Sequence, residues 1–305
     1  MKTESNPNNQ PLMCIVGPTA SGKSALAVEL ALQLGGEIIS CDSMQIYRDC
    51  DIVTAKATHA ERELVPHHLL DIVEPNESFS AASWARMANE VIEEIEARGK
   101  MPIVCGGTGF YLRALLAPHT LAVAPPNEQL RAELQAQWER EGKEVMHAKL
   151  AEVDAAAAAR LHPNDTHRVL RALEVALSPS VAVPFDLPTR NAKVWGLSWT
   201  RELLVGRIDE RVEAMIDAGA LDETRTLVGQ FGDEVPALGS VGYKQLCAHM
   251  RGELNWAEAV EAWKIATRQY SKRQMTWFRG QTEAVWLDAT LGIEKLVGSV
   301  IGAEA

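Results

Sequence analysis

The sequence predicts an α/β protein in which a parallel sheet is flanked by helices, and two observations support this fold class. Short apolar runs alternate with longer segments of helical spacing. A glycine-rich segment also lies between the first apolar run and the first helical one. Such alternation is typical of parallel β-α units, whose ligands bind at the carboxyl ends of the strands.

The elements follow from periodicity and from the residues that interrupt it. The predicted strands are apolar runs at residues 12–16, 37–41, 69–73, 102–105, 193–199 and 285–287. Helices are predicted at residues 24–34 and 80–98, from residue 110 onward, and through most of residues 201–279. Gly35 and Gly99 mark the ends of the first two helices, because glycine readily adopts the left-handed conformation.

A helical insertion interrupts this pattern. Residues 118–126 break the alternation, residues 127–177 look almost wholly helical, and residues 178–189 contain three prolines. A chain of 305 residues also suggests about two domains, at roughly 100–200 residues each. We therefore expect a P-loop catalytic core with C-terminal helices, formed by residues 1–126 and 190–305, and a helical insertion domain at residues 127–189.

The composition indicates which binding partners and which cellular compartment to expect. The net charge of −11 argues against nucleic acid binding over the whole surface, because phosphate contacts need Lys and Arg. Five cysteines form no C-x-x-C pair, which favours buried reduced thiols. Residues 1–11 lack the apolar core of a signal peptide, and no apolar run approaches the ~20 residues of a membrane span. We expect a cytoplasmic monomer that does not bind membranes.

The segment Gly17–Ser24 matches the phosphate-binding pattern G-x-x-x-x-G-K-[ST] in full, with a strand before it and a helix after it. Glycines let the backbone curl so that successive N–H groups point inward, and the helix N-terminus adds partial positive charge. The sheet is therefore expected to be P-loop NTPase-like. The residues predicted to bind diphosphate are Gly17, Thr19, Ala20, Ser21, Gly22, Lys23 and Ser24, with the Ser24 hydroxyl as a ligand of Mg²⁺.

Asp42 is the best candidate for a catalytic carboxylate. The run 102–105 ends in Gly106-Gly107 without the acid that a nucleotide-hydrolysing P-loop protein places there. Asp42 ends the second predicted strand, where it could accept a proton from a nucleophile near the phosphates. The alternative is a helix N-cap or turn residue, a role that Asp often fills.

Eight segments, in order over residues 12–287, together resemble the bacterial tRNA dimethylallyltransferases, also called tRNA isopentenyltransferases. Departures are a shortened stretch after Leu177 and Ser24 where threonine is common. The segments are residues 17–24, 42–47, 51–56, 66–71, 106–111, 171–174, 241–245 and 267–274.

This resemblance implies transfer of a dimethylallyl group from dimethylallyl diphosphate to N6 of adenosine 37, beside the anticodon of tRNAs that read codons beginning with U. It implies Mg²⁺ as cofactor, Asp42 as general base, Thr108 beside the reacting centre, and Arg211 on the diphosphate. The residues expected to contact the tRNA anticodon stem-loop are Asp42, Ser43, Met44, Gln45, Thr108, Arg168, Arg171, Gly242, Tyr243, Lys244, Lys272, Arg273 and Gln274.

A basic helix face could bind RNA locally despite the acidic total. No acidic residue occurs between Glu261 and Glu283, and Lys264, Arg268 and Lys272 share one face of the predicted helix. A solvated helix face is the alternative. Trp263, Tyr270 and Trp277 recur every seven residues, which predicts packing against the core. The adjacent His67 and His68 would point apart in a strand, so we do not expect a metal site there.

Three other functions share parts of this pattern. An isopentenyltransferase that acts on free adenylate would use the same phosphate loop and Asp42, but it needs no long helical insertion. A small-molecule kinase would require a second acid near the phosphates. A non-catalytic RNA-binding module would have no need of an intact phosphate loop beside Asp42.

Overall fold

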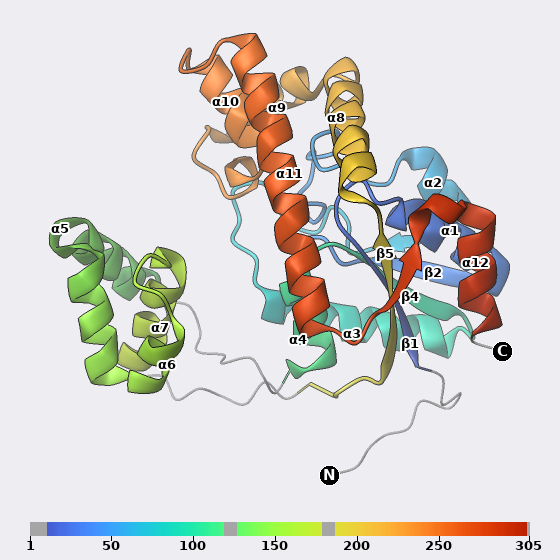
Figure 1. Cartoon of the computed structure of the whole chain (residues 1–305), viewed down its shortest axis with the longest axis horizontal. Coiled ribbons are helices and arrows are strands. Elements are labelled where there is room, and N and C mark those ends of the chain that lie inside the picture. The colour runs from blue at the N-terminus through green and yellow to red at the C-terminus, as the bar shows by residue number, and fades with distance from the viewer. Residues whose placement is uncertain (1–10, 119–126, 179–186, 304–305) are drawn as a thin grey trace. The chain divides into compact units, whose positions relative to one another are not determined.

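The structure is a computed structural model that describes residues 11–118, 127–178 and 187–303. The chain divides into two compact units (Figure 1). One unit combines Met1–Ala117 with Pro188–Ala305, and the other is Pro118–Leu187. The larger unit contains the sheet and the phosphate loop, so it positions the candidate site.

Six parallel strands form the sheet, in the order β3-β2-β4-β1-β5-β6, which confirms the predicted fold class. Every residue of β1 and β2 is buried, as expected for central parallel strands covered on both faces. The strands are β1 Leu12–Val16, β2 Gly36–Ser40, β3 His67–His68, β4 Met101–Gly106, β5 Ala192–Ser198 and β6 Val285–Asp288.

The predicted strand at residues 69–73 is wrong. Leu69 and Asp71 have φ angles of 61° and 56°, which a strand does not permit. The third strand is instead His67–His68, and Val73 makes only an isolated bridge to Tyr47. The other five predicted strands are confirmed to within one or two residues.

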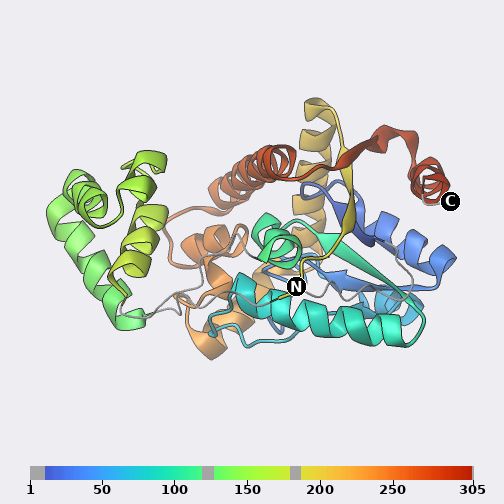
Figure 2. The ribbon, with the colours of Figure 1, turned by 90° about the horizontal axis from the view of Figure 1, so that it is seen from below.

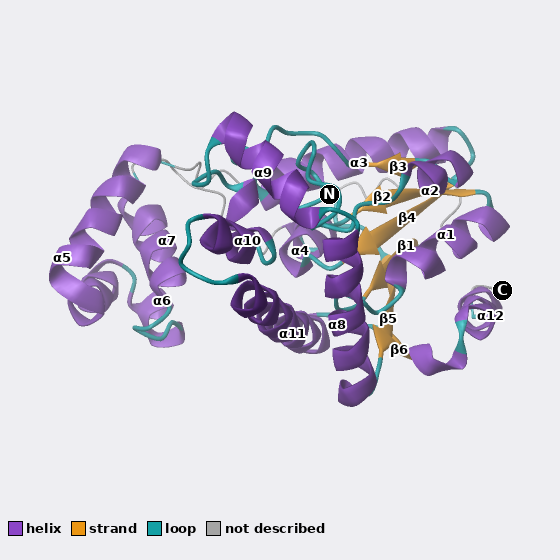
Figure 3. Ribbon diagram, turned by 90° about the horizontal axis from the view of Figure 1, so that it is seen from above, coloured by secondary structure: helices purple, strands orange, loops and turns teal. Residues whose placement is uncertain are grey.

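Helices cover both faces of the sheet (Figures 2 and 3). On one face, α1 packs with α12, whose Leu296, Val297 and Val300 join the buried cluster of the sheet. On the other face lie α3 and α4. The helices of this unit are α1 Lys23–Leu34, α2 His59–Leu64, α3 Ala81–Ala97, α4 Gly109–Leu116, α8 Arg201–Asp217, α9 Ala220–Phe231, α10 Tyr243–Met250, α11 Trp256–Gln281 and α12 Ile293–Gly302.

The sequence signals for helix ends are confirmed where the structure describes them. Gly35 ends α1 with a φ angle of 64° and donates its N–H to Ala31. Ser80 begins α3, where its side chain accepts the N–H of Ser83. Helix α12 was not predicted, and the short α2 falls in a stretch to which no helix was assigned.

The smaller unit is helical, as predicted for residues 127–177. It contains α5 Glu128–Val153, which is broken at Gly142, α6 Ala155–Arg160 and α7 Thr166–Leu177. Buried side chains of α5 and α7, including Met146, Leu150 and Leu173, form its core. Residues 119–126 and 179–186, where the sequence predicts a break and a loop, lie outside the described residues.

All five cysteines are buried and free, in agreement with the prediction of reduced thiols. Over the described ranges, none of the helices combines the length and apolar character that a membrane span demands.

The contact between β2 and β4 at their carboxyl ends gives a testable prediction. A methyl group at Gly106 would lie 2.1 Å from the carbonyl oxygen of Cys41, so Gly106→Ala must push the two strands apart. We expect a loss of about 1–3 kcal/mol in the free energy of unfolding, measured with urea. Gly206→Ala is the matched control, since it meets no neighbouring atom within 4 Å and replaces a helical glycine. It should stabilise the protein by roughly 0.5–1 kcal/mol. Equal stability of the two variants would contradict the close packing at Gly106.

Candidate functional site

The phosphate loop runs from the end of β1 to the start of α1. Gly22, with a φ angle of 90°, precedes the first helical turn, and the exposed Ser24 lies within that turn. The Lys23 ammonium folds back over the loop and donates to the carbonyl oxygen of Pro18 at 3.4 Å. Burial lowers the pKa of Lys23; the nearby Arg211 lowers it further, whereas Asp42 opposes the shift. The loop lines a cavity of about 460 Å³ together with Arg211.

Two residues beyond β5 hold the loop in shape, and the sequence did not reveal their role. The Arg207 guanidinium donates through Nε to the carbonyl of Ala20 at 2.8 Å. It also lies 4.4 Å above the ring of Trp199, whose Nε1 donates to the carbonyl of Ser21 at 2.9 Å. Ala20 has a φ angle of 62°, which is unfavourable for a residue with a Cβ. These two contacts stabilise that strained turn from nearly 190 residues away.

Gln274, on α11, supports the phosphate loop through its side-chain amide. Its Oε1 accepts the N–H of Thr19 at 2.8 Å, and its Nε2 donates to the carbonyl of Gly107 at 3.0 Å. The side chain is 6% exposed. Gln274 therefore joins the two glycine-rich loops that follow β1 and β4, and is not available to bind RNA.

Asp42 lies directly after β2, beside the end of β4. Its Oδ1 accepts the N–H of Met44 at 2.9 Å, so the turn role considered as an alternative is also present. The hydroxyl of Thr108 accepts the N–H of Ser43 at 2.9 Å and donates to the Ser43 hydroxyl at 3.2 Å. Thr108 thus fixes the turn that carries Asp42.

A cavity of about 380 Å³ opens in front of Asp42. Its lining includes Met44, Arg211, Lys244, Tyr270 and Arg273. Burial, and then the charge of Asp42, raise the pKa of the Tyr270 hydroxyl. The Tyr270 hydroxyl is therefore close enough to the Asp42 carboxylate to interact with its charge.

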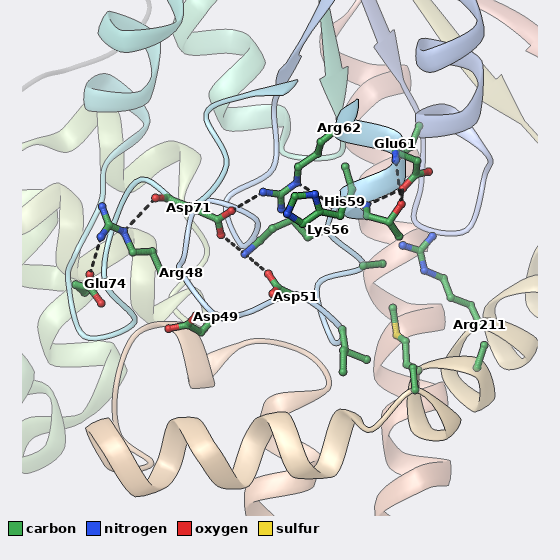
Figure 4. Close-up of a pocket in the computed structure, with 18 residues that line it drawn as sticks. Arg48, Asp49, Asp51, Lys56, His59, Glu61, Arg62, Asp71, Glu74 and Arg211 are labelled. Atoms are coloured by element: carbon green, nitrogen blue, oxygen red, sulfur yellow. Dashed lines mark hydrogen bonds and ion pairs between the residues drawn. The ribbon is translucent and has the colours of Figure 1, made fainter. Parts of the chain in front are cut away.

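Arg211 connects the phosphate loop with Asp42. It lines the loop cavity, the Asp42 cavity and a third cavity of about 1000 Å³, which also reaches Ser24 (Figure 4). Burial lowers the pKa of Arg211, and the negative charge of Asp42 opposes this shift. The structure thus brings Lys23, Arg211 and Asp42 together, three residues that the sequence singled out separately.

Two further residues expected to contact RNA build the site from inside. Tyr243 is fully buried and donates its hydroxyl to Glu223 at 2.6 Å, so its side chain cannot touch RNA. The amide of Gln45 donates to the carbonyls of Thr54 and Ala55, at 3.3 and 3.1 Å, and accepts the hydroxyl of Ser40. Both residues therefore support the walls of the site from within the protein.

The basic face predicted on α11 is only partly available. Lys264 forms an ion pair with Glu213, and Arg268 binds Asp209 through two nitrogens at 2.6 and 2.9 Å. Lys272 and Arg273 are both exposed, but only Arg273 lines the Asp42 cavity, with its guanidinium 5.8 Å from the centre of the Tyr270 ring.

The aromatic residues predicted to pack against the core from α11 differ in burial. Trp263 is buried, as predicted. Tyr270 is only half-buried and lines the Asp42 cavity, so its assignment to core packing alone is wrong.

In the helical unit, the two predicted RNA-binding arginines differ. Arg168 is exposed and lies 3.6 Å from Asp165. Arg171 pairs with Glu174 at 2.9 Å, and the Glu174 side chain is only 2% exposed. The ion pair assigns Arg171 a structural role within this unit.

Replacing Gln274 by Leu should loosen the phosphate loop. Leucine fills a similar volume but leaves the N–H of Thr19 and the carbonyl of Gly107 without partners, at about 1–3 kcal/mol each. We expect lower thermal stability and about tenfold weaker binding of diphosphate, measured by calorimetry. The control Gln281→Leu changes an exposed amide at the end of the same helix. Unaltered diphosphate affinity in Gln274→Leu would contradict the bracing role.

Several known proteins are similar to this chain over most of its length. The family model described as IPP transferase matches residues 45–281. A tRNA dimethylallyltransferase of Geobacter metallireducens is 45% identical over 300 residues, which cover 95% of this chain and 96% of that protein. One from Anaeromyxobacter dehalogenans is 48% identical over 283 residues, covering 90% and 94%.

Solved structures give the same result. The tRNA isopentenylpyrophosphate transferase of Bacillus halodurans has a TM-score of 0.71 and 38% identity, and the match covers 96% of each chain. A eukaryotic dimethylallyltransferase acting on tRNA has a TM-score of 0.74 and 29% identity, over 91% of this chain and 73% of that one. The family model alone spans more than half of the sequence, and this chain therefore belongs to the IPP transferase family.

Proposed function

We propose that this protein transfers a dimethylallyl group from dimethylallyl diphosphate to N6 of adenosine 37, in tRNAs that read codons beginning with U. The observation that carries the proposal is the position of Arg211, which lines both the phosphate-loop cavity and the Asp42 cavity. A leaving anion and a proton acceptor can thus act on the same reacting centre. The names of the similar proteins, tRNA dimethylallyltransferases, support the same reaction.

The donor half of the site stabilises the leaving diphosphate. Backbone N–H groups at the start of α1, the Lys23 ammonium and the Arg211 guanidinium would neutralise its charge. As that charge is neutralised, the bond between the allylic carbon and the diphosphate oxygen breaks more readily. These donors are partly buried, which strengthens their effect relative to exposed groups.

The residues present fit a Mg²⁺ ion that arrives with the donor. No group of three His, Cys, Asp or Glu side chains that could hold a metal occurs in the described part of the chain. Mg²⁺ commonly takes one or two protein oxygens together with substrate phosphates and water, and the exposed Ser24 hydroxyl can supply one. Bound there, the ion would add positive charge on the diphosphate oxygens.

The acceptor half binds an adenine that has left the stacked anticodon loop. Such a base must be flipped out before it reaches a cavity, at a cost of a few kcal/mol. Tyr270 and Arg273 offer a ring and a guanidinium on which it can stack. Its N6 amine bonds to the allylic carbon and loses a proton to the Asp42 carboxylate, while Thr108 holds the Asp42 turn in place.

RNA binding in this proposal depends on a few exposed cations. Arg273 and Lys244 line the cavity, Lys272 is exposed next to Arg273 in sequence, and Arg168 is exposed on α7 of the helical unit. So few phosphate contacts predict a modest dependence of affinity on salt concentration. We take the enzyme to be a cytoplasmic monomer, since one chain carries every group that the reaction uses.

Mass analysis of tRNA nucleosides tests the reaction. Incubation with dimethylallyl diphosphate and an unmodified anticodon stem-loop should add one dimethylallyl group to adenosine 37 without ATP. Modification of free adenylate instead of RNA, or turnover of ATP without prenyl transfer, would contradict the proposal.

Asp42→Asn is expected to lower kcat by about 10²–10⁴, since the amide cannot accept the proton from N6. Diphosphate affinity should remain within about threefold, because the phosphate loop is intact. Asp49→Asn is the matched control, because Asp49 is an exposed carboxylate two residues after Tyr47. Prenylation by Asp42→Asn at the wild-type rate would remove Asp42 from the chemistry.

A further inference from the structure

The segment Asp51–Lys56 forms a thin wall between two cavities. Asp51, Ile52, Ala55 and Lys56 line the large cavity of about 1000 Å³, shown in Figure 4. Val53 and Thr54, between them in sequence, line the Asp42 cavity. This stretch of backbone therefore forms one part of the boundary between the two cavities, which also share Arg211 and Met215 in their lining.

Glu223 of α9 holds one end of this wall. Its Oε2 accepts the N–H groups of Asp51 and Ile52 at 2.9 and 2.6 Å, and its Oε1 accepts that of Val53 at 3.1 Å. The hydroxyl of Tyr243 donates to the same Oε1 at 2.6 Å. A carboxylate has about four lone-pair sites on its two oxygens, and four donors fill them here.

Lys56 holds the other end. Its side chain is 1% exposed, and its ammonium donates to the carbonyl of Tyr47 at 2.7 Å. It also pairs with Asp51 at 2.6 Å and Asp71 at 2.5 Å, contacts that Figure 4 shows beside the large cavity. With both ends fixed, the positions of Val53 and Thr54 in the Asp42 cavity are determined by contacts outside it.

Glu223 also connects this wall with a second segment that lines the Asp42 cavity, residues 241–244. Val241 and Lys244 line the Asp42 cavity on either side of Tyr243, whose hydroxyl binds Glu223. A Cβ at Gly242 would lie 2.5 Å from the Val53 side chain, so the two walls are in close contact. A single carboxylate thus connects two segments that are nearly 190 residues apart in sequence.

We propose that Glu223 is a positioning residue that sets the shape of the acceptor cavity and holds the wall that limits access from the large cavity. The inference rests on the proposed prenyl transfer. Without the carboxylate, three backbone N–H groups lose their acceptor, and Val53 and Thr54 can move. The adenine then fits less well, and water from the large cavity can reach the allylic carbon.

That water would divert the donor. The bond between the allylic carbon and diphosphate breaks, the water oxygen bonds to the carbon, and one of its protons passes to solvent. The products are dimethylallyl alcohol and diphosphate, in place of prenylated RNA and diphosphate.

Glu223→Gln tests the inference with almost no change in volume. An amide offers one acceptor oxygen and turns its NH₂ group toward N–H donors. We expect the KM for the stem-loop to rise about tenfold while the KM for the donor stays within about twofold. The ratio of alcohol to prenylated RNA should increase, and the amides of residues 51–53 should exchange hydrogen faster.

Two controls define the effect. Asp222→Asn changes the neighbouring carboxylate, which is 80% exposed and pairs with Arg225, and should match the wild type in all four measurements. Tyr243→Phe removes one of the four donors to Glu223 and should show a smaller change in the same direction, even if Glu223→Gln folds poorly.

The inference is overturned if amides 51–53 of Glu223→Gln remain as protected as in the wild type, or if its donor KM rises instead of its RNA KM. Loss of stability with an unchanged KM and an unchanged alcohol ratio would also overturn it. A wild-type protein that transfers nothing to RNA would contradict the proposed function. Hydrogen exchange does not depend on activity, so the amides of residues 51–53 would still test whether Glu223 holds the wall.

Discussion

The site depends on how closely the ends of β2 and β4 approach each other. Gly106 lies so near the Cys41 carbonyl that no side chain fits between them. Immediately beyond that contact, the Thr108 hydroxyl binds the backbone and side chain of Ser43. The turn that carries Asp42 is therefore tied to the loop after β4. Gln274 ties that second loop to the phosphate loop. Through these contacts, the carboxylate and the anion-binding loop keep a fixed separation.

The electrostatics of the site favour an anionic ligand. Lys23 and Arg211 are cations whose pKa values are lowered by burial, and Asp42 partly opposes the shift of each. Burying two positive charges near one carboxylate costs free energy unless another anion is present. A diphosphate would supply that anion and recover part of the cost as binding free energy. The same cations lie near Asp42, so in the proposed reaction the release of diphosphate would alter the electrostatic field that acts on the Asp42 carboxylate.

The sequence predicted what local patterns determine. Apolar runs gave five of the six strands, and the phosphate loop and Asp42 followed from residue types at strand ends. The third strand was misplaced because Leu69 and Asp71 adopt left-handed conformations that an apolar run does not reveal. The roles of Gln274 and Tyr243 could not be predicted, since their partners Thr19 and Glu223 are identified only by tertiary contacts. The motifs indicated that these residues are functional. They did not show whether each side chain contacts a ligand or supports another part of the protein.

The distribution of charge on α11 explains how an acidic protein can direct RNA to one place. In the N-terminal half of the helix, Lys264 and Arg268 are neutralised by Glu213 and Asp209 of α8. Further along, Lys272 and Arg273 are exposed in a stretch of sequence without acidic residues, and Arg273 lines the Asp42 cavity. Ion pairs between the two helices thus neutralise Lys264 and Arg268, whereas Arg273 keeps its positive charge at the cavity. Because screening limits each charge to about 8–10 Å at physiological ionic strength, phosphates are attracted mainly where the unpaired cations lie. Pairing within the protein, more than the number of basic residues, determines where an RNA backbone can bind.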